Sequence, residues 1–257
     1  MIPILLISCG GVAPTPEPPA HLQQSEAGRI ILEAIEAQGG WAAWSRARTA
    51  EYVMEQPPAE EGQPPLRHRY TLDLHGGRVR IEDTASGVLQ GWDGNEAWTH
   101  PEEAPVEIPA RFSTRTEHFW FCLPWKLADQ EANLELLEDE VLEGQTYHRV
   151  RVTYGADVGD TSEDWYIYYF NAETRLLEHA LFIVTFFGLE PGQSEFPTYY
   201  GRWTDPKAVG GLKIVSRRRF GMWTGAPPEQ YLYDERLVEL SVSRQSPQDD
   251  LFTRPGR

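Results

Sequence analysis

The stretch DWYIYYFNAETRLLEHALFIVTFF, residues 164–187, decides the fold class of this chain. It holds two runs of aromatic and β-branched residues, 164–171 and 176–187, and such composition favours strands. The turn Asn171-Ala172-Glu173-Thr174 separates them. So short a link joins antiparallel neighbours, because a parallel crossover needs a dozen or more residues. Residues 165–170 and 181–187 are apolar in both alternating positions, so we expect these strands to be covered on both faces or to line a cavity.

The same pattern extends in both directions from this hairpin. Gly-containing turns such as His75-Gly76-Gly77, Asp93-Gly94-Asn95 and Val209-Gly210-Gly211 punctuate it. Alternation of apolar and polar residues, as in Tyr70, Leu72 and Leu74, gives several strands one wet face. The pattern predicts ten to twelve antiparallel strands, with candidates at 49–55, 68–74, 78–83, 88–93, 96–100, 134–142, 146–154, 164–171, 176–187, 198–204, 212–220 and 229–243.

Helical signals are few. Ser25 can cap a helix over residues 25–38, with an apolar face of Ala27, Ile31, Ala34 and Ile35 and a stop at Gly39-Gly40. Trp41 and Trp44 follow about one turn apart, so both can lie on one apolar surface. The Pro-rich residues 101–125 interrupt the strands and predict an excursion over an edge or mouth of the sheet, with a short helix around 115–121.

The amino terminus resembles a bacterial lipoprotein signal. Residues 1–8 are almost wholly apolar, and Leu6-Ile7-Ser8-Cys9 is similar to the lipobox, in which the Cys is alkylated by a diacylglyceryl group and its new amino terminus acylated, for example with palmitate. Residues 10–20 are rich in Gly and Pro and read as a tether. The alternative is that residues 1–7 form a first strand and Cys9 is a buried thiol. We expect a signal over 1–8, a tether over 9–22 and a single β domain over 23–257.

The composition of the chain restricts the classes of function that can be expected. The chain has 257 residues and a formal charge of −16, so a nucleic-acid partner is not expected. No apolar run approaches the roughly 18 to 20 residues of a spanning helix. Two cysteines and seven scattered histidines predict no metal site and no cofactor, and Cys122 reads as a small buried hydrophobe with no base beside it. The run Arg217-Arg218-Arg219 alternates across a strand, where a solvated edge with ion pairs, or an anion or lipid-headgroup contact, is expected.

Several of these features together resemble the LolA-like lipoprotein carrier superfamily, and in particular its outer-membrane lipoprotein-sorting-like members. The features are the lipobox, a helix that ends in Gly-Gly-Trp with a second Trp close by, the stretch GWDGNEAW at 91–98, and the aromatic strand with its Asn-x-Glu-Thr turn. The resemblance implies a mainly β fold, namely a strongly curved antiparallel sheet that forms an incomplete barrel, with helices closing its apolar concave face. It carries over no catalytic residues. A sheet of this size is expected to curl, and the helix over 25–38 is expected to cover it.

We therefore expect a non-enzymatic, monomeric, membrane-anchored envelope lipoprotein that binds an apolar small molecule or lipid in the sheet concavity. The anchor is Cys9, and Gly10 after it indicates the outer membrane, facing the periplasm. Alternatives are an envelope hydrolase that uses a carboxylate pair, or a structural or interaction lipoprotein with a filled core. The expected ligand-binding residues are Trp41, Trp44, Tyr70, Leu72, Trp98, Trp165, Ile167 and Phe182.

Overall fold

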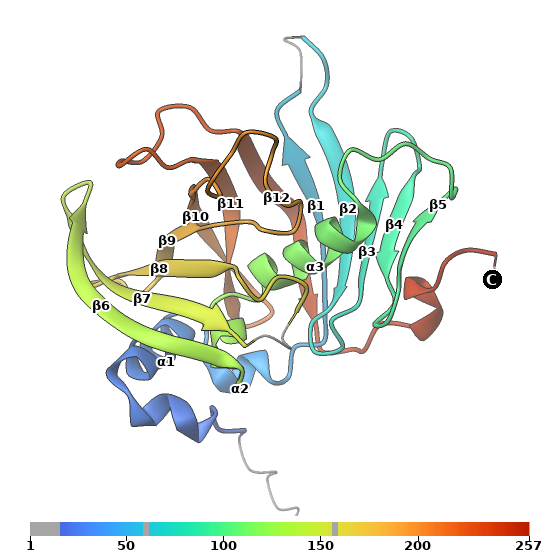
Figure 1. Cartoon of the computed structure of the whole chain (residues 1–257). Coiled ribbons are helices and arrows are strands. Elements are labelled where there is room, and N and C mark those ends of the chain that lie inside the picture. The colour runs from blue at the N-terminus through green and yellow to red at the C-terminus, as the bar shows by residue number, and fades with distance from the viewer. Residues whose placement is uncertain (1–15, 59–61, 156–158, 257) are drawn as a thin grey trace, which may run out of the picture.

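The computed structural model describes residues 16–58, 62–155 and 159–256. The predicted lipidation site, Cys9, and the signal therefore lie outside the described residues. Twelve antiparallel strands form one sheet in the order β5-β4-β3-β2-β1-β12-β11-β10-β9-β8-β7-β6 (Figure 1). The strands are β1 (Thr49–Gln56), β2 (Leu66–Asp73), β3 (Val79–Asp83), β4 (Leu89–Trp92), β5 (Ala97–His100), β6 (Ala132–Leu142), β7 (Gln145–Tyr154), β8 (Trp165–Asn171), β9 (Leu177–Phe182), β10 (Tyr199–Val209), β11 (Leu212–Met222) and β12 (Tyr233–Ser243).

The sheet is strongly curved and does not close on itself, since β5 and β6 are its edge strands. The prediction of an incomplete antiparallel barrel is confirmed, and each predicted strand corresponds to an observed one. The largest differences lie at β10, which runs on to Val209 instead of ending at residue 204, and at β9, which ends at Phe182 instead of residue 187. The Thr185 amide donates to the Asp164 carboxylate at 2.8 Å, so the chain leaves the sheet there. The edge strand β6 carries an irregularity between Leu137 and Glu140.

The predicted first helix is confirmed as α1 (Glu26–Ala37). The Ser25 hydroxyl oxygen accepts the Gly28 amide at 3.0 Å, which is the predicted N-cap. A short helix α2 (Trp41–Trp44) follows. Before α1, the 3-10 helix η1 (Ala20–Gln24) places Leu22 in the main core with no exposed surface, so the folded part begins earlier than residue 23. No helix in residues 16–58, 62–155 and 159–256 is long and apolar enough to cross a membrane.

The Pro-rich excursion differs from its prediction. It contains a three-turn helix, α3 (Ala110–Phe121), followed by η2 (Trp125–Ala128). Figure 1 shows α3 in the middle of the curved sheet, and it contacts β3, β4 and β5. The predicted start near residue 115 and the position over an edge or mouth were wrong. The helix begins after Pro109, whose carbonyl oxygen accepts the Phe112 and Ser113 amides of the first turn at 2.9 and 3.0 Å. The ion pair described below holds the helix inside the curved sheet.

Apolar side chains gather on both faces of the sheet. The main core fills the concave side between the sheet, α1, α2 and η2. A second cluster lies on the outer face, where Trp165 and Ile167 pack around Tyr169 and Leu181. The expectation that these strands are covered on both faces or line a cavity is thus confirmed for β8, because its alternate residues belong to the two cores, while residues 183–187 lie beyond the end of β9.

Within the stretch GWDGNEAW, Gly91 and Trp98 face the outer side of the sheet, whereas Trp92 faces the concave side. Gly91 pairs with Trp98, and the Trp98 indole N–H donates to the Phe252 carbonyl at 2.8 Å in the 3-10 helix η3 (Asp249–Phe252). A Cβ at Gly91 would overlap the Trp98 ring. Only glycine lets the indole lie flat across the strand, so this motif attaches the C-terminal segment to the sheet.

We predict that Gly91→Ala destabilises the protein by about 1 to 3 kcal/mol, because the added methyl group overpacks the site. Urea unfolding monitored by circular dichroism measures this. In a Trp98→Ala background the same substitution should cost much less, since the overlapping ring is gone. Equal costs in both backgrounds would contradict the explanation.

Candidate functional groove

A groove of about 1700 Å³ opens on the concave side of the sheet, between α3 and the strands around it. Its lining is contributed by β1 to β4, α3, β7 to β9, β10 to β12 and the segment after β9. Many of the lining side chains are apolar, among them Met54, Tyr70, Ile81, Phe119, Tyr166, Phe182, Phe186, Tyr199 and Phe220. The sheet is thus only partly filled by its core.

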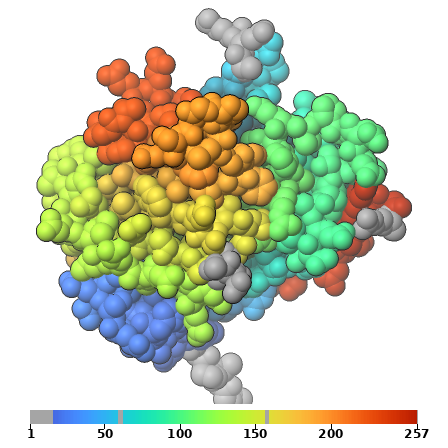
Figure 2. All heavy atoms as spheres, viewed as in Figure 1, coloured from blue at the N-terminus to red at the C-terminus, as the bar shows by residue number. Residues whose placement is uncertain are grey.

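The segment after β9 meets the start of α3 at the surface. In Figure 2 the yellow-orange segment lies against the green one. The ring of Phe112 is 5.1 Å from that of Phe186 and 4.7 Å from that of Phe187. Phe187 is 58% exposed, as is Leu232, while Tyr233 and Val106 are 46% and 38% exposed. All of these residues line the groove, so its mouth has an apolar rim.

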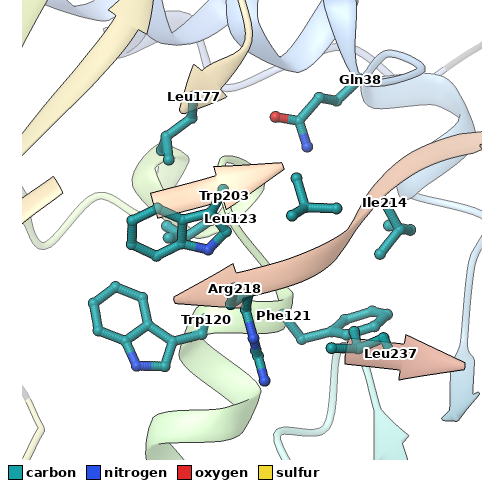
Figure 3. A pocket seen from close by; sticks show the side chains of 10 residues that line it. Gln38, Trp120, Phe121, Leu123, Leu177, Trp203, Ile214, Arg218 and Leu237 are labelled. Carbon is teal, nitrogen blue, oxygen red and sulfur yellow. The ribbon is translucent and has the colours of Figure 1, made fainter. Parts of the chain in front are cut away.

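A buried ion pair holds α3 in the concavity. The Arg218 guanidinium of β11 donates to both carboxylate oxygens of Glu117 at 3.0 and 2.8 Å, and also to Glu235 of β12 at 2.8 Å. Arg218 is 2% exposed and lies between Trp120 and Phe121 (Figure 3). The Tyr52 hydroxyl donates to Glu117 as well. The ion pair expected for residues 217–219 is present at Arg217, which contacts the partly exposed Asp234, but β11 is not an edge strand and Arg218 is buried, so the interpretation as a solvated edge was wrong.

Two carboxylates share this one guanidinium. Burial, more than the nearby Glu117, raises the pKa of Glu235, whereas Arg218 opposes the rise. The pKa of Arg218 is itself raised by Glu117 and Glu235, against the effect of burial. Glu235 therefore takes up a proton more readily than an exposed glutamate, although the Arg218 guanidinium lies 2.8 Å away.

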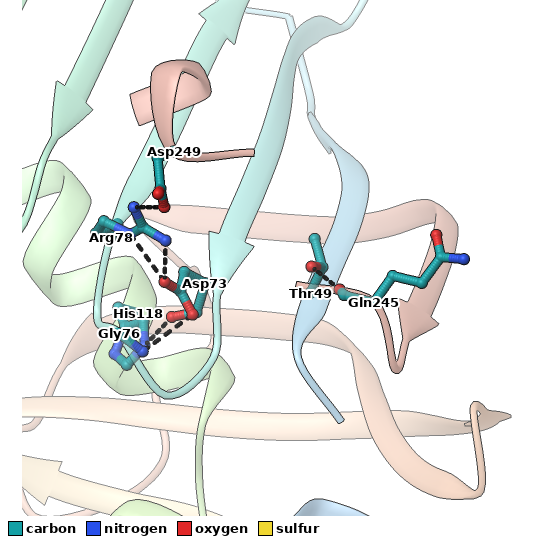
Figure 4. A network of polar contacts seen from close by, with 7 residues as sticks. All are labelled: Thr49, Asp73, Gly76, Arg78, His118, Gln245 and Asp249. Carbon is teal, nitrogen blue, oxygen red and sulfur yellow. Dashed lines mark hydrogen bonds and ion pairs between the residues drawn. The ribbon is translucent and has the colours of Figure 1, made fainter. Parts of the chain in front are cut away.

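The C-terminal half of α3 is fixed by a second polar network (Figure 4). The His118 imidazole Nε2 lies 3.2 Å from the Asp73 carbonyl oxygen at the end of β2. The Asp73 carboxylate in turn accepts from the Gly76 amide and from Arg78, which also donates to Asp249. Through these contacts α3, the β2–β3 turn and η3 are tied together.

His118 also lies 3.7 Å from the Cys122 thiol, so the expectation that no base stands beside this cysteine was wrong. The pair is nevertheless unsuited to thiolate chemistry. Burial raises the pKa of Cys122 and lowers the pKa of His118 to about 4, so both groups are neutral at pH 7. Cys122 is 1% exposed, as expected for a small buried hydrophobe.

The structure brings four of the eight predicted ligand-binding residues to the groove, namely Trp41, Trp44, Tyr70 and Phe182. Leu72 faces the same side and is fully packed in the core. Trp98, Trp165 and Ile167 lie on the outer face. The prediction had missed the α3 residues Thr116 and Phe119 and the strand residue Tyr166. Alternation along β8 separates Tyr166 from Ile167, but both faces of that strand are apolar, so the sequence alone does not say which one is concave.

The charge of the lining is mostly negative. Nine carboxylate side chains and four Lys or Arg side chains line the groove. Two of the cations, Arg111 and Arg115, are paired with Asp160 and lie over the Trp92 ring. In the described part of the chain, no group of three or more His, Cys, Asp or Glu residues is placed to hold a metal ion.

This geometry is that of the LolA-like fold. A solved LolA superfamily protein from Nitrosomonas europaea superposes with a TM-score of 0.56 at 14% identity, over 89% of this chain and 97% of that one. A DUF1329 family protein from Desulfovibrio piger gives a TM-score of 0.51 at 11% identity, over 88% and 97% of the two chains. At these identities the likeness shows the fold alone. No family model and no curated protein matches the sequence.

We predict that Arg218→Met destabilises the protein by about 3 to 5 kcal/mol, because it leaves Glu117 and Glu235 buried without their counter-charge. Chemical denaturation measures the change. Arg217→Met, which removes the neighbouring surface pair with Asp234, should cost less than about 1 kcal/mol. Similar losses for the two variants would mean that the buried pair does not hold α3.

Proposed function

We propose that the chain is a membrane-anchored binding protein that holds an apolar ligand, an acyl chain or another lipid, in the groove between α3 and the sheet without chemical conversion. The observation that carries this proposal is the groove of about 1700 Å³ with its aromatic lining. Small-molecule sites commonly measure about 300 to 1,000 Å³, so this groove has room for one long chain or more.

The exposed apolar rim supports the same function. Large apolar side chains at a groove mouth are exposed to water in the free protein, and such patches commonly mark interaction or ligand sites. Phe187 and Leu232 both reach the mouth. A ligand that enters there passes from one apolar surface to the next.

The two other readings have less support. A carboxylate pair does line the groove, but Glu117 and Glu235 both contact Arg218, and a general acid and base need to reach a substrate. We therefore favour a non-enzymatic role. A structural lipoprotein with a filled core would have no use for so large a groove. We further propose that the described residues act as one monomeric binding unit.

We predict that the wild-type protein binds N-phenyl-1-naphthylamine, an uncharged apolar probe, and that Thr116→Trp weakens binding at least tenfold. Thr116 lies on the groove side of α3 and is partly exposed, so an indole there occupies the groove without entering the core. The gain in probe fluorescence measures binding. A matched control is Thr146→Trp at an exposed position of β7 that does not line the groove.

Failure of the wild type to bind the probe at high concentration would overturn the proposal. So would a Thr116→Trp protein that is folded, as judged by its melting temperature, and binds as well as the control.

The anchor is proposed to be a lipid on Cys9, followed by a tether, with the protein held at the outer membrane and facing the periplasm. The Leu6-Ile7-Ser8-Cys9 sequence and the Gly that follows it support this.

We predict that Cys9→Ser moves the full chain from the membrane to the soluble fraction and removes the mass of the acyl groups. An unchanged distribution and an unchanged mass would contradict it.

A further inference from the structure

Two tyrosine hydroxyls at one wall of the groove have no hydrogen-bond partner among the described residues. They belong to Tyr154 of β7 and Tyr168 of β8, and both oxygens are buried. Tyr154 lines the groove. Tyr168 has no exposed surface, and its ring is stacked on that of Tyr166, which lines the groove. Buried hydroxyls are paired in the great majority of cases, so a neighbouring pair without partners points to a group that is bound there in the working protein.

The two hydroxyls belong to one aromatic wall. The Tyr166 ring lies 6.4 Å from that of Tyr154 and is stacked on that of Tyr168 at 5.7 Å. Phe119 of α3 closes the wall, 6.3 Å from Tyr154 and 5.3 Å from Tyr166. Burial first, and then the Tyr154 and Tyr166 hydroxyls, raise the pKa of Tyr168, and burial likewise raises the pKa of Tyr154. Both unpartnered hydroxyls therefore keep their protons and can donate.

The surroundings restrict what they can donate to. After burial, the largest influence on the pKa of Tyr154 is the nearby Asp129 carboxylate, which raises it. Asp164 lies on the other side, 3.5 Å from the Tyr166 hydroxyl, and already accepts from Thr161 and from the Thr185 amide. Neither carboxylate is without partners, since Asp129 pairs with Lys126. A ligand carboxylate placed here would meet like charge, whereas an uncharged oxygen would not.

We propose that the hydroxyls of Tyr154 and Tyr168 bind an uncharged acceptor oxygen, such as an ester carbonyl, at the polar end of the ligand. The groove then selects neutral amphiphiles over free fatty-acid anions of the same chain length. This inference rests on the proposed function, and it adds to it a headgroup site and a charge preference.

Three competitors of N-phenyl-1-naphthylamine with the same alkyl chain separate the contributions of the chain, the carbonyl group and the charge to binding. Dodecane tests the apolar groove alone, methyl dodecanoate adds the uncharged carbonyl, and dodecanoate adds the charge. The wild type should bind methyl dodecanoate about 3- to 10-fold more tightly than dodecane, which corresponds to one hydrogen bond. Dodecanoate should bind more weakly than the ester.

Tyr154→Phe removes one hydroxyl and no carbon atom. It should abolish most of the preference for the ester and leave dodecane binding unchanged. Tyr168→Phe should act in the same direction. The matched control is Tyr169→Phe, which removes a hydroxyl from the outer face of β8, away from the groove, and should keep the preference. The melting temperature of ligand-free Tyr154→Phe should be equal to or above that of the wild type, because a buried hydroxyl without a partner is lost.

The outcomes can be told apart. If dodecane does not bind, the proposed function fails and this inference fails with it. If dodecane binds but the ester gains nothing over it, or the acid binds best, only the headgroup site is overturned. A lower melting temperature for Tyr154→Phe, with no change in preference, would mean that the hydroxyl is already paired within the folded protein, and would also overturn the site.

Discussion

The arrangement of the concave side depends on one buried interaction, the pairing of Arg218 with Glu117. An isolated charge in this interior would be strongly destabilising, so each partner requires the other. The position of α3 is fixed because its residue Glu117 pairs with Arg218 of β11. Its apolar residues Trp120 and Phe121 then complete the main core, while its other side faces the groove. The ion pair thus determines how the concavity is divided between packed core and open space.

The strands and the first helix could be predicted because their signals are local. Turn residues, alternation and the Ser25 cap act within a few positions of the chain. The place of α3 could not be predicted in this way. It follows from a contact between residues 101 positions apart, and Glu117 stands among many acidic residues that look alike in the sequence. The alternation of Arg217-Arg218-Arg219 indicated that Arg218 points to the opposite face of the strand from its two neighbours. Nothing in the sequence identified Glu117 as its partner.

Only four of the eight predicted ligand-binding residues line the groove, because the face of the sheet to which each aromatic residue belongs is also not a local property. Aromatic residues occur on both faces of this sheet, so richness in Trp and Tyr identifies packing and binding positions alike. Trp98 stabilises the attachment of η3, and Trp165 supports the outer cluster, whereas Tyr166 reaches the groove. Odd and even positions along a strand point to opposite faces of the sheet, but the direction in which the sheet curves decides which of these faces is concave. That direction is a property of the whole sheet.

An open sheet leaves two edges, and its longer edge, β6, would be a ready template for another strand. The sequence of β6 counters this. Glu135, Glu138 and Asp139 are exposed along it, and its pairing with β7 is irregular between Leu137 and Glu140. A second chain that approached this edge would meet like charges and an interrupted ladder of hydrogen bonds. The half-barrel is therefore open along a long edge whose acidic side chains and irregular pairing disfavour the addition of a strand from a second copy.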